Sequence, residues 1–323
     1  MIVMNKILDE VKGATTIAIG GHIRPDGDCV GSCLALYLYL SKTLKNADIK
    51  VFLEKPRDIF NCISGINKIK DASKSSQKFD VFIALDCNEE RLGDSVPIFR
   101  DALKKINIDH HISNKGCGDV NYIFPQASST SELIFDLMDE SYLDKEIAKA
   151  IYIGIIHDTG VFQYSNTSEK TLQIAAKLIS FDFDFPKLID ETFYEKTYIQ
   201  NQILGRALLE SVLFMNKTCI VSAIDKKTME FYNVVPADLD GIVNQLRYTK
   251  GVECAIFLYE SDFQQYKVSM RSGGEIDVSK IAQYFSGGGH VRAAGCSING
   301  TVYDVINNLS LQIEKQMEMK NND

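Results

Sequence analysis

Aspartate and histidine residues gather in four short segments in the first half of the sequence. These segments cover residues 21–32, 84–94, 107–114 and 156–168. The five histidines of the chain lie in these segments or in one glycine-rich segment further on: His22, His110, His111, His157 and His290. A single histidine is more often a packing or surface residue. All five in Asp-rich or Gly-rich junctions are hard to attribute to packing.

Carboxylates and imidazoles without thiolates favour Mn²⁺ or Mg²⁺ over zinc, and the imidazoles favour manganese. The candidate ligands are too many for one catalytic ion that keeps room for water. Two ions about 3.5–4 Å apart, bridged by a carboxylate and a water, would use them all. Such a pair provides hydroxide at neutral pH and neutralises charge on an attacked phosphate.

Each segment also has a simpler interpretation. Residues 25–28 (Pro-Asp-Gly-Asp) could form a plain turn, Asp86 could cap the segment after its strand, and Asp158 could be a loop carboxylate. The triplet 109–111 (Asp-His-His) is the hardest to explain in this way. Adjacent side chains on an extended segment point in opposite directions, so they could serve a metal and a substrate separately. Together the segments favour a metal site.

The elements that must position these residues alternate between strands and helices. Short apolar runs predict strands over residues 15–20, 49–53, 79–85 and 105–108. Helical periodicity follows over residues 31–44, from a capping box that begins at Ser129, and over 145–156. Short apolar strands that alternate with helices predict an α/β fold with a parallel, doubly wound sheet.

Three of the four segments directly follow predicted strands. In an open α/β sheet, ligands bind beyond the carboxyl ends of the strands. We therefore expect the three segments to meet at one edge of the sheet. The fourth segment ends the helix over 145–156 and joins them if that helix points the same way.

The second half predicts a smaller α/β domain with a mixed sheet. A long helical pattern over 198–215 predicts a helix that connects the two halves. Strands are predicted over 218–224, 253–259, 266–271 and 294–298, with a helix over 278–285. The expected organisation is a first domain with the Asp- and His-rich segments (1–190), a helical connector (191–216) and a second domain (217–323), with a cleft between the two domains.

The glycine-rich segment is a candidate phosphate site. Gly287, Gly288 and Gly289 allow backbone amides to turn inward around an anion. A glycine run alone is more often a flexible turn, but here His290 follows it. Arg271, on a predicted strand, could hold a phosphate bidentately. Two other arginines, Arg91 and Arg247, are weaker candidates, and a surface role is the simpler interpretation of both.

Composition narrows the classes of function. Hydrophobic residues make up 45% and charged residues 24% of the chain, as in folded globular proteins. The net charge of −8 argues against a grip on long nucleic acid, which needs clustered Lys and Arg. Small phosphorylated ligands remain compatible, because bound metals supply positive charge.

Compartment can be predicted from features that the sequence lacks. No run approaches the roughly 18 apolar residues of a membrane span. Residues 1–10 carry Lys6, Asp9 and Glu10 and so lack a signal-peptide core. The eight cysteines form no Cys-x-x-Cys pair, which favours buried reduced thiols over a zinc site. A cytoplasmic location without membrane association is the expectation.

Three motifs carry a resemblance to a known family. Residues 22–32 read His-x-x-Pro-Asp-Gly-Asp-x-x-Gly-Ser, residues 109–111 are the Asp-His-His triplet, and residues 286–295 read SGGGHVRAAG. With these motifs nearly the whole chain resembles the DHH phosphoesterase family with its DHH-associated C-terminal domain. It is most similar to the bacterial oligoribonuclease (nanoRNase) and 3′-phosphoadenosine 5′-phosphate phosphatase subgroup. Ser286 stands where many relatives carry a further glycine.

The resemblance implies a set of metal ligands. One ion would be held by His22, Asp26 and Asp86, and the other by Asp28, Asp86, His110 and Asp158. The Asp86 carboxylate would therefore bridge the two ions. Mn²⁺ is the favoured ion, with Mg²⁺ and Co²⁺ as alternatives.

The resemblance also implies roles around the metals. Asp109 would orient a ligating histidine, and His111 would contact the substrate phosphate or protonate the leaving oxygen. Arg271 and the segment 287–290 would bind the nucleotide end away from the metals. His157 matches no ligand position of the family and is predicted to be structural.

The expected activity is hydrolysis of short oligoribonucleotides to mononucleotides, of 3′-phosphoadenosine 5′-phosphate to AMP, or of both. The resemblance implies in-line attack by a hydroxide held between two metals. One alternative is a pyrophosphatase or polyphosphatase, and another is a nucleotide-binding sensor with an inactive site. A homodimer is a possible assembly of this chain.

Overall fold

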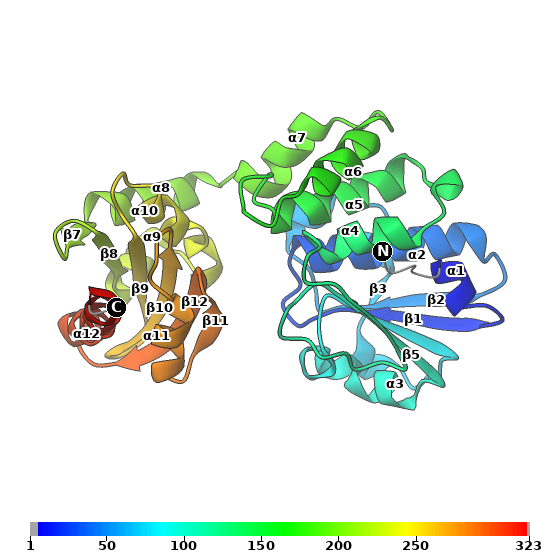
Figure 1. The fold of residues 1–323 in the computed structure, drawn as a ribbon, viewed down its shortest axis with the longest axis horizontal. Helices are drawn as coiled ribbons and strands as arrows, with labels where there is room; N and C mark the ends of the chain where they lie inside the picture. The colour runs from blue at the N-terminus through cyan, green and yellow to red at the C-terminus, as the bar shows by residue number, and fades with distance from the viewer. Residues whose placement is uncertain (1–5, 322–323) are drawn as a thin grey trace. The chain divides into compact units, whose positions relative to one another are not determined.

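The chain folds into two compact units. The structure is a computed structural model that describes residues 6–321. Unit 1 comprises Met1–Glu195 and unit 2 comprises Lys196–Asp323 (Figure 1). Each unit has its own sheet and its own apolar core. The predicted two-domain α/β architecture is confirmed, and the finer division at 190 and 216 stays a prediction.

Unit 1 is built on a six-stranded sheet. Its strands are β1 (Thr16–Gly20), β2 (Asp48–Phe52), β3 (Ile69–Lys70), β4 (Val81–Leu85), β5 (Lys104–Asp109) and β6 (Val120–Ile123). The strand order is β3-β2-β1-β4-β5-β6, and every pairing is parallel. The chain leaves β1 toward β2 and later returns to β4 on the other side of β1. This reversal creates a crevice at the carboxyl ends of β1 and β4, where ligands bind in such sheets.

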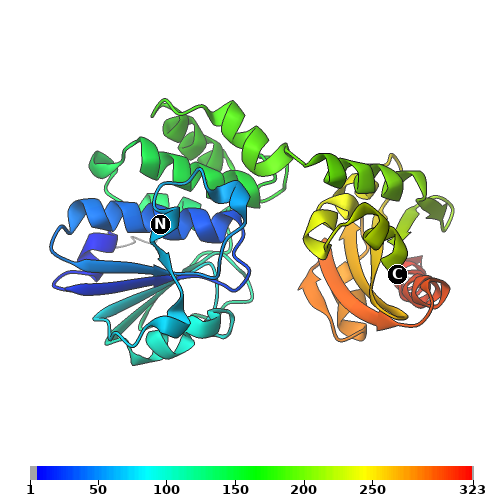
Figure 2. The ribbon, with the colours of Figure 1, turned by 180° about the vertical axis from the view of Figure 1, so that it is seen from behind.

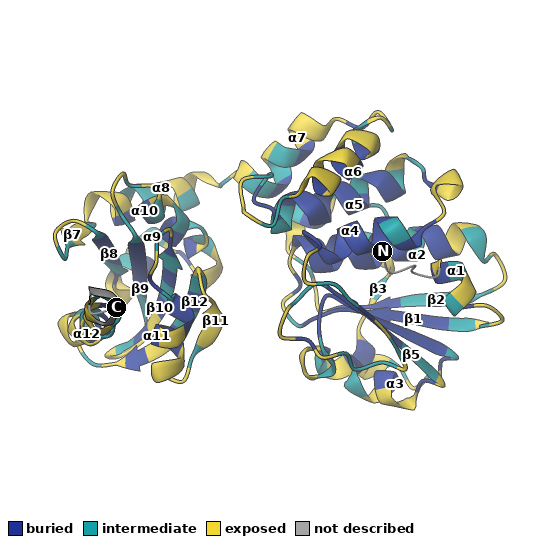
Figure 3. Cartoon of the chain, in the orientation of Figure 1, coloured by how far each residue is buried: buried dark blue, intermediate teal, exposed yellow. Residues whose placement is uncertain are grey.

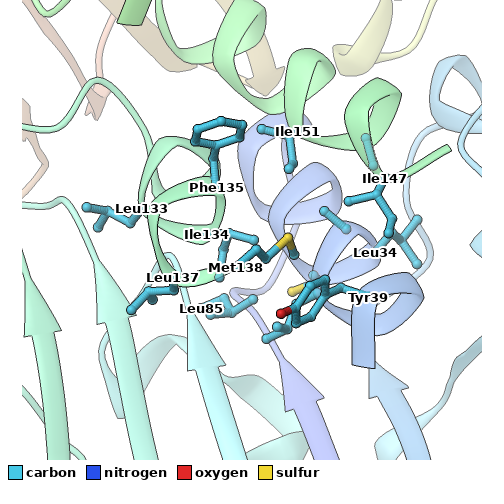
Figure 4. Packing of buried hydrophobic residues seen from close by; sticks show 14 of the residues in the cluster. Leu34, Tyr39, Leu85, Leu133, Ile134, Phe135, Leu137, Met138, Ile147 and Ile151 are labelled. Atoms are coloured by element: carbon cyan, nitrogen blue, oxygen red, sulfur yellow. The ribbon is translucent and has the colours of Figure 1, made fainter. Parts of the chain in front are cut away.

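Helices cover both faces of this sheet unequally. They are α1 (Ile7–Glu10), α2 (Gly27–Thr43), α3 (Val96–Asp101), α4 (Thr130–Leu137), α5 (Lys145–Asp158), α6 (Glu169–Ile179) and α7 (Phe185–Ile189), which continues as a π-helical turn (Asp190–Tyr194). In both views α2, α4 and α5 lie on one face and α3 on the other (Figures 1 and 2). The larger core lies between the sheet and α2, α4 and α5, with Leu34, Ile134 and Ile151 at its centre (Figure 4).

Two helix boundaries differ from the predictions in ways that matter for the site. Helix α2 begins at Gly27, four residues earlier than predicted, because Asp26 accepts hydrogen bonds from the first turn. Helix α5 extends two residues further than predicted and ends at Asp158. Both changes place acidic residues of the motifs inside or beside helices instead of loops. The predicted cap of α4 at Ser129 is confirmed.

Unit 2 holds a mixed six-stranded sheet. Its strands are β7 (Val212–Phe214), β8 (Cys219–Ile224), β9 (Cys254–Asp262), β10 (Gln265–Ser272), β11 (Gly288–His290) and β12 (Ala293–Asn299), in the order β11-β12-β10-β9-β8-β7. Only β8 and β9 pair in parallel. Its helices are α8 (Tyr198–Leu209), α9 (Lys226–Tyr232), α10 (Ile242–Arg247), α11 (Val278–Tyr284) and α12 (Val302–Asn321).

Two predictions for this half were wrong in detail. The helix predicted over 198–215 ends at Leu209, and β7 follows it. Three consecutive residues with positive φ, at 215–217, then turn the chain into β8. The glycine-rich segment contains an edge strand, β11, where a loop was expected.

The burial pattern agrees with two separate cores. Buried residues line the inner sides of the helices and the strands of each unit, while exposed residues cover the outer helix faces (Figure 3). Among the residues that the structure describes, no helix combines the length and the apolar character that a bilayer crossing requires. Residues 1–5, which belong to the N-terminal segment tested for a signal peptide, lie outside the described part.

Candidate metal centre

His22 begins the site directly after β1. Its side chain is buried, and Nδ1 lies 2.9 Å from the carbonyl oxygen of Ile23. A donating Nδ1–H leaves Nε2 as the metal-binding nitrogen. Nε2 lies 3.4 Å from Asp86 Oδ2 and 3.6 Å from Asp26 Oδ1. Burial alone would lower the pKa of His22, but the hydrogen bonds to these two carboxylates raise it well above its usual value.

The two aspartates of the first motif, Asp26 and Asp28, differ in burial and in their hydrogen-bond partners. Asp26 is exposed and caps α2, because its Oδ1 accepts from the backbone N–H groups of Asp28 and Cys29 at 3.2 and 3.1 Å. Asp28 is buried in the first turn of α2. Both of its oxygens accept from the start of α4, from Thr130 N at 2.6 Å and Ser131 N at 2.9 Å. The N-terminus of α4 therefore fixes the Asp28 carboxylate and offsets part of its charge.

Asp86 lies between the two groups of candidate ligands. Its Oδ2 faces His22 at 3.4 Å, whereas its Oδ1 lies 3.6 Å from His110 Nε2 and 3.5 Å from His111 Nδ1. The hydroxyl of Thr130 also donates to Oδ1, at 3.0 Å. The two oxygens thus face different histidines, which is the arrangement that a bridging carboxylate needs. The side chain is 2% exposed.

The backbone of Asp86 is also unusual. Its φ of 60° lies in the left-handed region, directly after β4. This conformation costs an L-residue roughly 1–2 kcal/mol, although Asp and Asn tolerate it best. Non-glycine residues in such conformations cluster at functional sites, where the surrounding structure holds them.

His110 and Asp158 complete the second group. His110 Nε2 lies 3.0 Å from Asp158 Oδ2, yet it is buried without a well-formed hydrogen bond to any described residue. Burial would lower the pKa of His110, but the nearby carboxylates of Asp158, Asp28 and Asp86 raise it to about 10. One ligand atom each from Asp28, His110 and Asp158 lies within 4.8 Å of the other two.

Asp109 contacts His111, whereas a contact with one of the ligating histidines was expected. Its Oδ1 lies 2.7 Å from His111 Nδ1. Asn114 donates to Asp109 Oδ2 at 2.6 Å, and the backbone N–H of His111 donates to Oδ1. Asp109 is the last residue of β5, and its hydrogen bonds with His111 fix the ring of that histidine. The hydrogen bond from His111 lowers the pKa of Asp109 despite burial, which alone would raise it.

His157 packs as a structural residue, as predicted. Its ring makes edge contacts with Phe60 and Phe193, at centroid distances of 5.1 and 5.5 Å. A Cβ on Gly27 would lie 2.2 Å from this ring, which explains the glycine between the two motif aspartates. Burial lowers the pKa of His157 to about 4, so the ring is neutral at pH 7. Of the described residues, none combines with it in a candidate ligand group.

The chemistry of these donors fits divalent metal ions. Burial and the neighbouring charges of Asp86 and Asp158 raise the pKa of Asp28 well above its usual range. Burial also raises the pKa of Asp86, against the hydrogen bond from His22. Carboxylates gathered in this way repel one another, and the nearby Nε2 of His110 lacks a hydrogen bond. Cations between these oxygen and nitrogen atoms would relieve both problems.

Three residues near these groups were absent from the predicted site. Thr130 holds both Asp28 and Asp86, Asn114 holds Asp109, and Cys29 Sγ lies in a ligand group with His22 and Asp86. The segment around Thr130 was interpreted only as a helix cap. The run of hydroxyl residues at 128–131 was the signal that could have indicated more.

The predicted phosphate-binding residues lie together in unit 2. Arg271 on β10 is paired with Ala293 on β12, and Ala293 is paired with His290 on β11. Directly opposed residues share one face of a sheet, so Arg271 and His290 flank a small alanine in one row. Arg271 donates through Nε to Asn244 Oδ1 at 3.0 Å and through Nη1 to the carbonyl of Met270 at 3.0 Å.

Two of the three glycines of this segment, Gly287 and Gly289, are required by close packing against β12. A Cβ on Gly287 would lie 2.3 Å from the carbonyl oxygen of Gly295, and one on Gly289 would lie 2.5 Å from that of Ala293. Gly288 has open space around it. Strand pairing therefore explains at least two of the three glycines without an anion. Of the weaker candidates, Arg91 is exposed and Arg247 stacks over the ring of Tyr248.

Comparisons with known proteins agree with this arrangement. Residues 16–155 match the model "DHH family, N-terminal domain", and residues 216–319 match "DHHA1 domain". A bifunctional oligoribonuclease and PAP phosphatase NrnA from Thermus thermophilus is 30% identical over 94% of this chain and 90% of its own length. The chain belongs to the DHH family.

Two further relatives support the DHH assignment. The NrnA of Bacillus subtilis, also named a bifunctional oligoribonuclease and PAP phosphatase, is 28% identical over 88% of this chain and 89% of its own length. The crystal structure of an exopolyphosphatase-related protein from Bacteroides fragilis has a TM-score of 0.89 and 26% identity. It covers 97% of this chain, and the match spans 96% of that protein. With these relatives, this DHH chain is a hydrolase that acts on phosphoester bonds.

Proposed function

We propose that the chain hydrolyses short oligoribonucleotides to mononucleotides and 3′-phosphoadenosine 5′-phosphate to AMP, on a pair of divalent ions bridged by Asp86. The observation that carries this proposal is the division of the Asp86 oxygens between two histidine–aspartate groups. The named activities of the NrnA relatives supply the substrate class. The cluster of aspartates and histidines supplies a site for metal-dependent hydrolysis.

Six residues would hold the ions. His22 and Asp26 serve one position, Asp28, His110 and Asp158 serve the other, and Asp86 serves both. When bound, such a pair of ions supplies a hydroxide nucleophile at neutral pH and neutralises charge on the attacked phosphate. The oxygen-rich donor set with imidazoles supports Mn²⁺, with Mg²⁺ and Co²⁺ as alternatives.

His111 would act on the substrate. Asp109 engages its Nδ1 at 2.7 Å and raises the pKa of His111. The ring is thereby held in a form that can donate from Nε2 to a phosphate oxygen, or protonate the leaving oxygen. Asp109 is the positioning residue in this pair, in the way that a carboxylate orients a catalytic imidazole.

Unit 2 would bind the nucleotide portion of the substrate. The row formed by Arg271 and His290 offers cationic and hydrogen-bonding groups on one sheet face. Arg271 could hold a terminal phosphate through its guanidinium, and the backbone of 287–289 approaches without side chains. A site for small phosphorylated ligands suits a chain with a net charge of −8, since few cationic groups are needed.

A second candidate is hydrolysis of pyrophosphate or polyphosphate. It is favoured by the structural likeness to the protein described as exopolyphosphatase-related. An inactive nucleotide sensor fits less well, because each motif retains its acids and histidines. The cytoplasmic location remains a prediction.

A hydrolysis panel tests the proposal. The substrates are a dinucleotide, a five-nucleotide RNA, 3′-phosphoadenosine 5′-phosphate and pyrophosphate, each with Mn²⁺. We expect turnover of the dinucleotide and of 3′-phosphoadenosine 5′-phosphate. Asp86→Asn should lower kcat more than about 100-fold, because loss of even an outer hydrogen-bond partner at a metal site costs about 10–100-fold. Asn tolerates the left-handed backbone at this position, so the loss reports on the charge.

Arg271→Ala provides a second arm of the same panel. It should raise KM for the nucleotides and leave the metal content unchanged. Turnover of pyrophosphate alone would replace the proposal with the second candidate. Normal hydrolysis by Asp86→Asn would refute the account of the metal centre.

A further inference from the structure

A cysteine lies among the candidate ligands of the first metal position. Cys29 is fully buried in the first turn of α2. Its Sγ forms a group with one ligand atom each of His22 and Asp86, and all three atoms lie within 4.8 Å of one another. Atoms about 4.6 Å apart or closer can share one ion at ordinary ligand distances of about 2.0–2.3 Å, so this group needs at most a small shift to bind one.

The sulfur is held at this place by the backbone around it. Asp26 accepts from the Cys29 N–H at 3.1 Å and so fixes the start of α2. Gly21, next to His22, provides the space, because a Cβ there would lie 2.2 Å from Cys29 Sγ. The sulfur therefore lies against the backbone of Gly21, one residue before His22.

We propose that Cys29 is a sulfur ligand of the metal position formed by His22, Asp26 and Asp86. This inference rests on the proposed metal centre and specifies which ion it prefers. The position then offers the nitrogen of His22, the sulfur of Cys29 and an oxygen of Asp86 as one close group, and Asp26 is not part of that group. Binding takes place through the thiolate, and the thiol proton passes to solvent.

The two metal positions consequently differ in softness. Thiolates favour Zn²⁺ and Co²⁺ over Mn²⁺ and Mg²⁺, and a set of nitrogen, sulfur and oxygen ligands suits zinc. The position of Asp28, His110 and Asp158 has no sulfur in its ligand group and keeps the preference for harder ions. The absence of a Cys-x-x-Cys pair therefore does not remove zinc affinity from this chain.

A second buried cysteine provides a matched control. Cys33 lies one helical turn after Cys29, on the same face of α2, and is equally buried. Its sulfur is close enough to Gly21 that a Cβ there would lie 3.3 Å away. Among the described residues, Cys33 belongs to no candidate ligand group. A change at Cys33 thus alters a neighbour that hydrogen-bonds the Cys29 thiol, without removing a ligand.

Cobalt binding to the full chain tests the proposal by absorption spectroscopy. Titration of wild type with Co²⁺ should give visible ligand-field bands together with a near-ultraviolet sulfur-to-cobalt charge-transfer band. The charge-transfer band should vanish in Cys29→Ser and persist in Cys33→Ser. In competition experiments, Cys29→Ser should lower the preference for Zn²⁺ over Mn²⁺ by at least about 10-fold, the scale on which changes around a metal site act.

The spectra separate two kinds of failure. Ligand-field bands without a charge-transfer band in wild type would overturn the role of Cys29 and leave the metal centre intact. The same conclusion holds if the band survives in Cys29→Ser or disappears in Cys33→Ser. No cobalt absorption at all would overturn the metal centre itself. Because wild type alone distinguishes these cases, the test does not depend on the folding of a variant.

Discussion

At the scale of single residues, several structural constraints of the site act on Asp86. It is buried, its backbone is left-handed, and its two oxygens face separate histidines. A buried carboxylate is costly without compensating charge. Burial raises the pKa of Asp86, as expected for a carboxylate held away from water without a cation. Bound cations would remove this cost.

Thr130 is the residue that couples Asp86 to the rest of the site. Its hydroxyl donates to Asp86 Oδ1 at 3.0 Å, and its backbone N–H donates to Asp28. Thr130→Val keeps the shape and the backbone bond but removes the hydroxyl. We expect a fall of about 10–100-fold in Mn²⁺ affinity, as is usual for partners that orient metal ligands. Isothermal titration measures it.

Thr43→Val is the matched control for this substitution. Thr43 ends α2, and its hydroxyl donates only to the carbonyls of Tyr39 and Leu40. Its loss should leave Mn²⁺ affinity unchanged. If Thr130→Val bound Mn²⁺ as tightly as wild type, the hydroxyl would have no part in holding Asp86.

At the scale of elements, a close crossing of α2 and α5 positions the acidic residues. A Cβ on Gly31 would lie 2.6 Å from the carbonyl oxygen of Ala150 and 2.9 Å from Gly154 N. On the other helix, a Cβ on Gly154 would lie 1.9 Å from Ser131 Oγ and 2.8 Å from Asp28 Oδ1. The glycines therefore let α2, α4 and α5 meet at Asp28.

Gly31→Ala should separate these helices. The contacts of the new methyl group are with backbone, which cannot rotate away. We expect unit 1 to lose about 1–3 kcal/mol of unfolding free energy, as in overpacked cores, and to bind Mn²⁺ more weakly. Urea denaturation of the metal-free protein measures the first effect.

Gly205→Ala controls for helix propensity. Gly205 lies within α8, and a Cβ there would meet nothing within 4 Å. Alanine should stabilise this helix by about 0.5–1 kcal/mol. A similar gain from Gly31→Ala would show that the crossing has room for a methyl group, contrary to the account.

Strand and helix patterns in the sequence predicted much of this arrangement. The three segments that follow predicted strands do lie at the carboxyl ends of β1, β4 and β5. Strand β3 has two residues, β7 and β11 have three each, and β11 is largely glycine, so none has a periodicity to detect. Residue β-propensity says little about such edges, which form through pairing with neighbours.

The side-chain geometry was less predictable. The contact of Asp109 with His111 depends on Asn114, which holds the second oxygen of Asp109. The place of Cys29 depends on the missing Cβ of Gly21. Both contacts lie within one segment, 107–114 or 21–32, and depend on how that segment bends in the folded chain. Spacing along the chain does not encode either one.

At the scale of the whole molecule, chemistry and recognition are assigned to different units. Unit 1 carries every candidate metal ligand, and unit 2 carries Arg271 and His290. Each unit has a core of its own. The proposed functions can therefore be disrupted separately, by variants of Asp86 in one unit and of Arg271 in the other.

Metal stoichiometry tests the central claim most directly. The full chain is dialysed to equilibrium against saturating Mn²⁺, and bound manganese is counted by elemental analysis. The account predicts two ions per wild-type chain and fewer, more weakly held ions in Asp86→Asn. One ion or none in wild type, or two equally tight ions in Asp86→Asn, would contradict a centre bridged by Asp86.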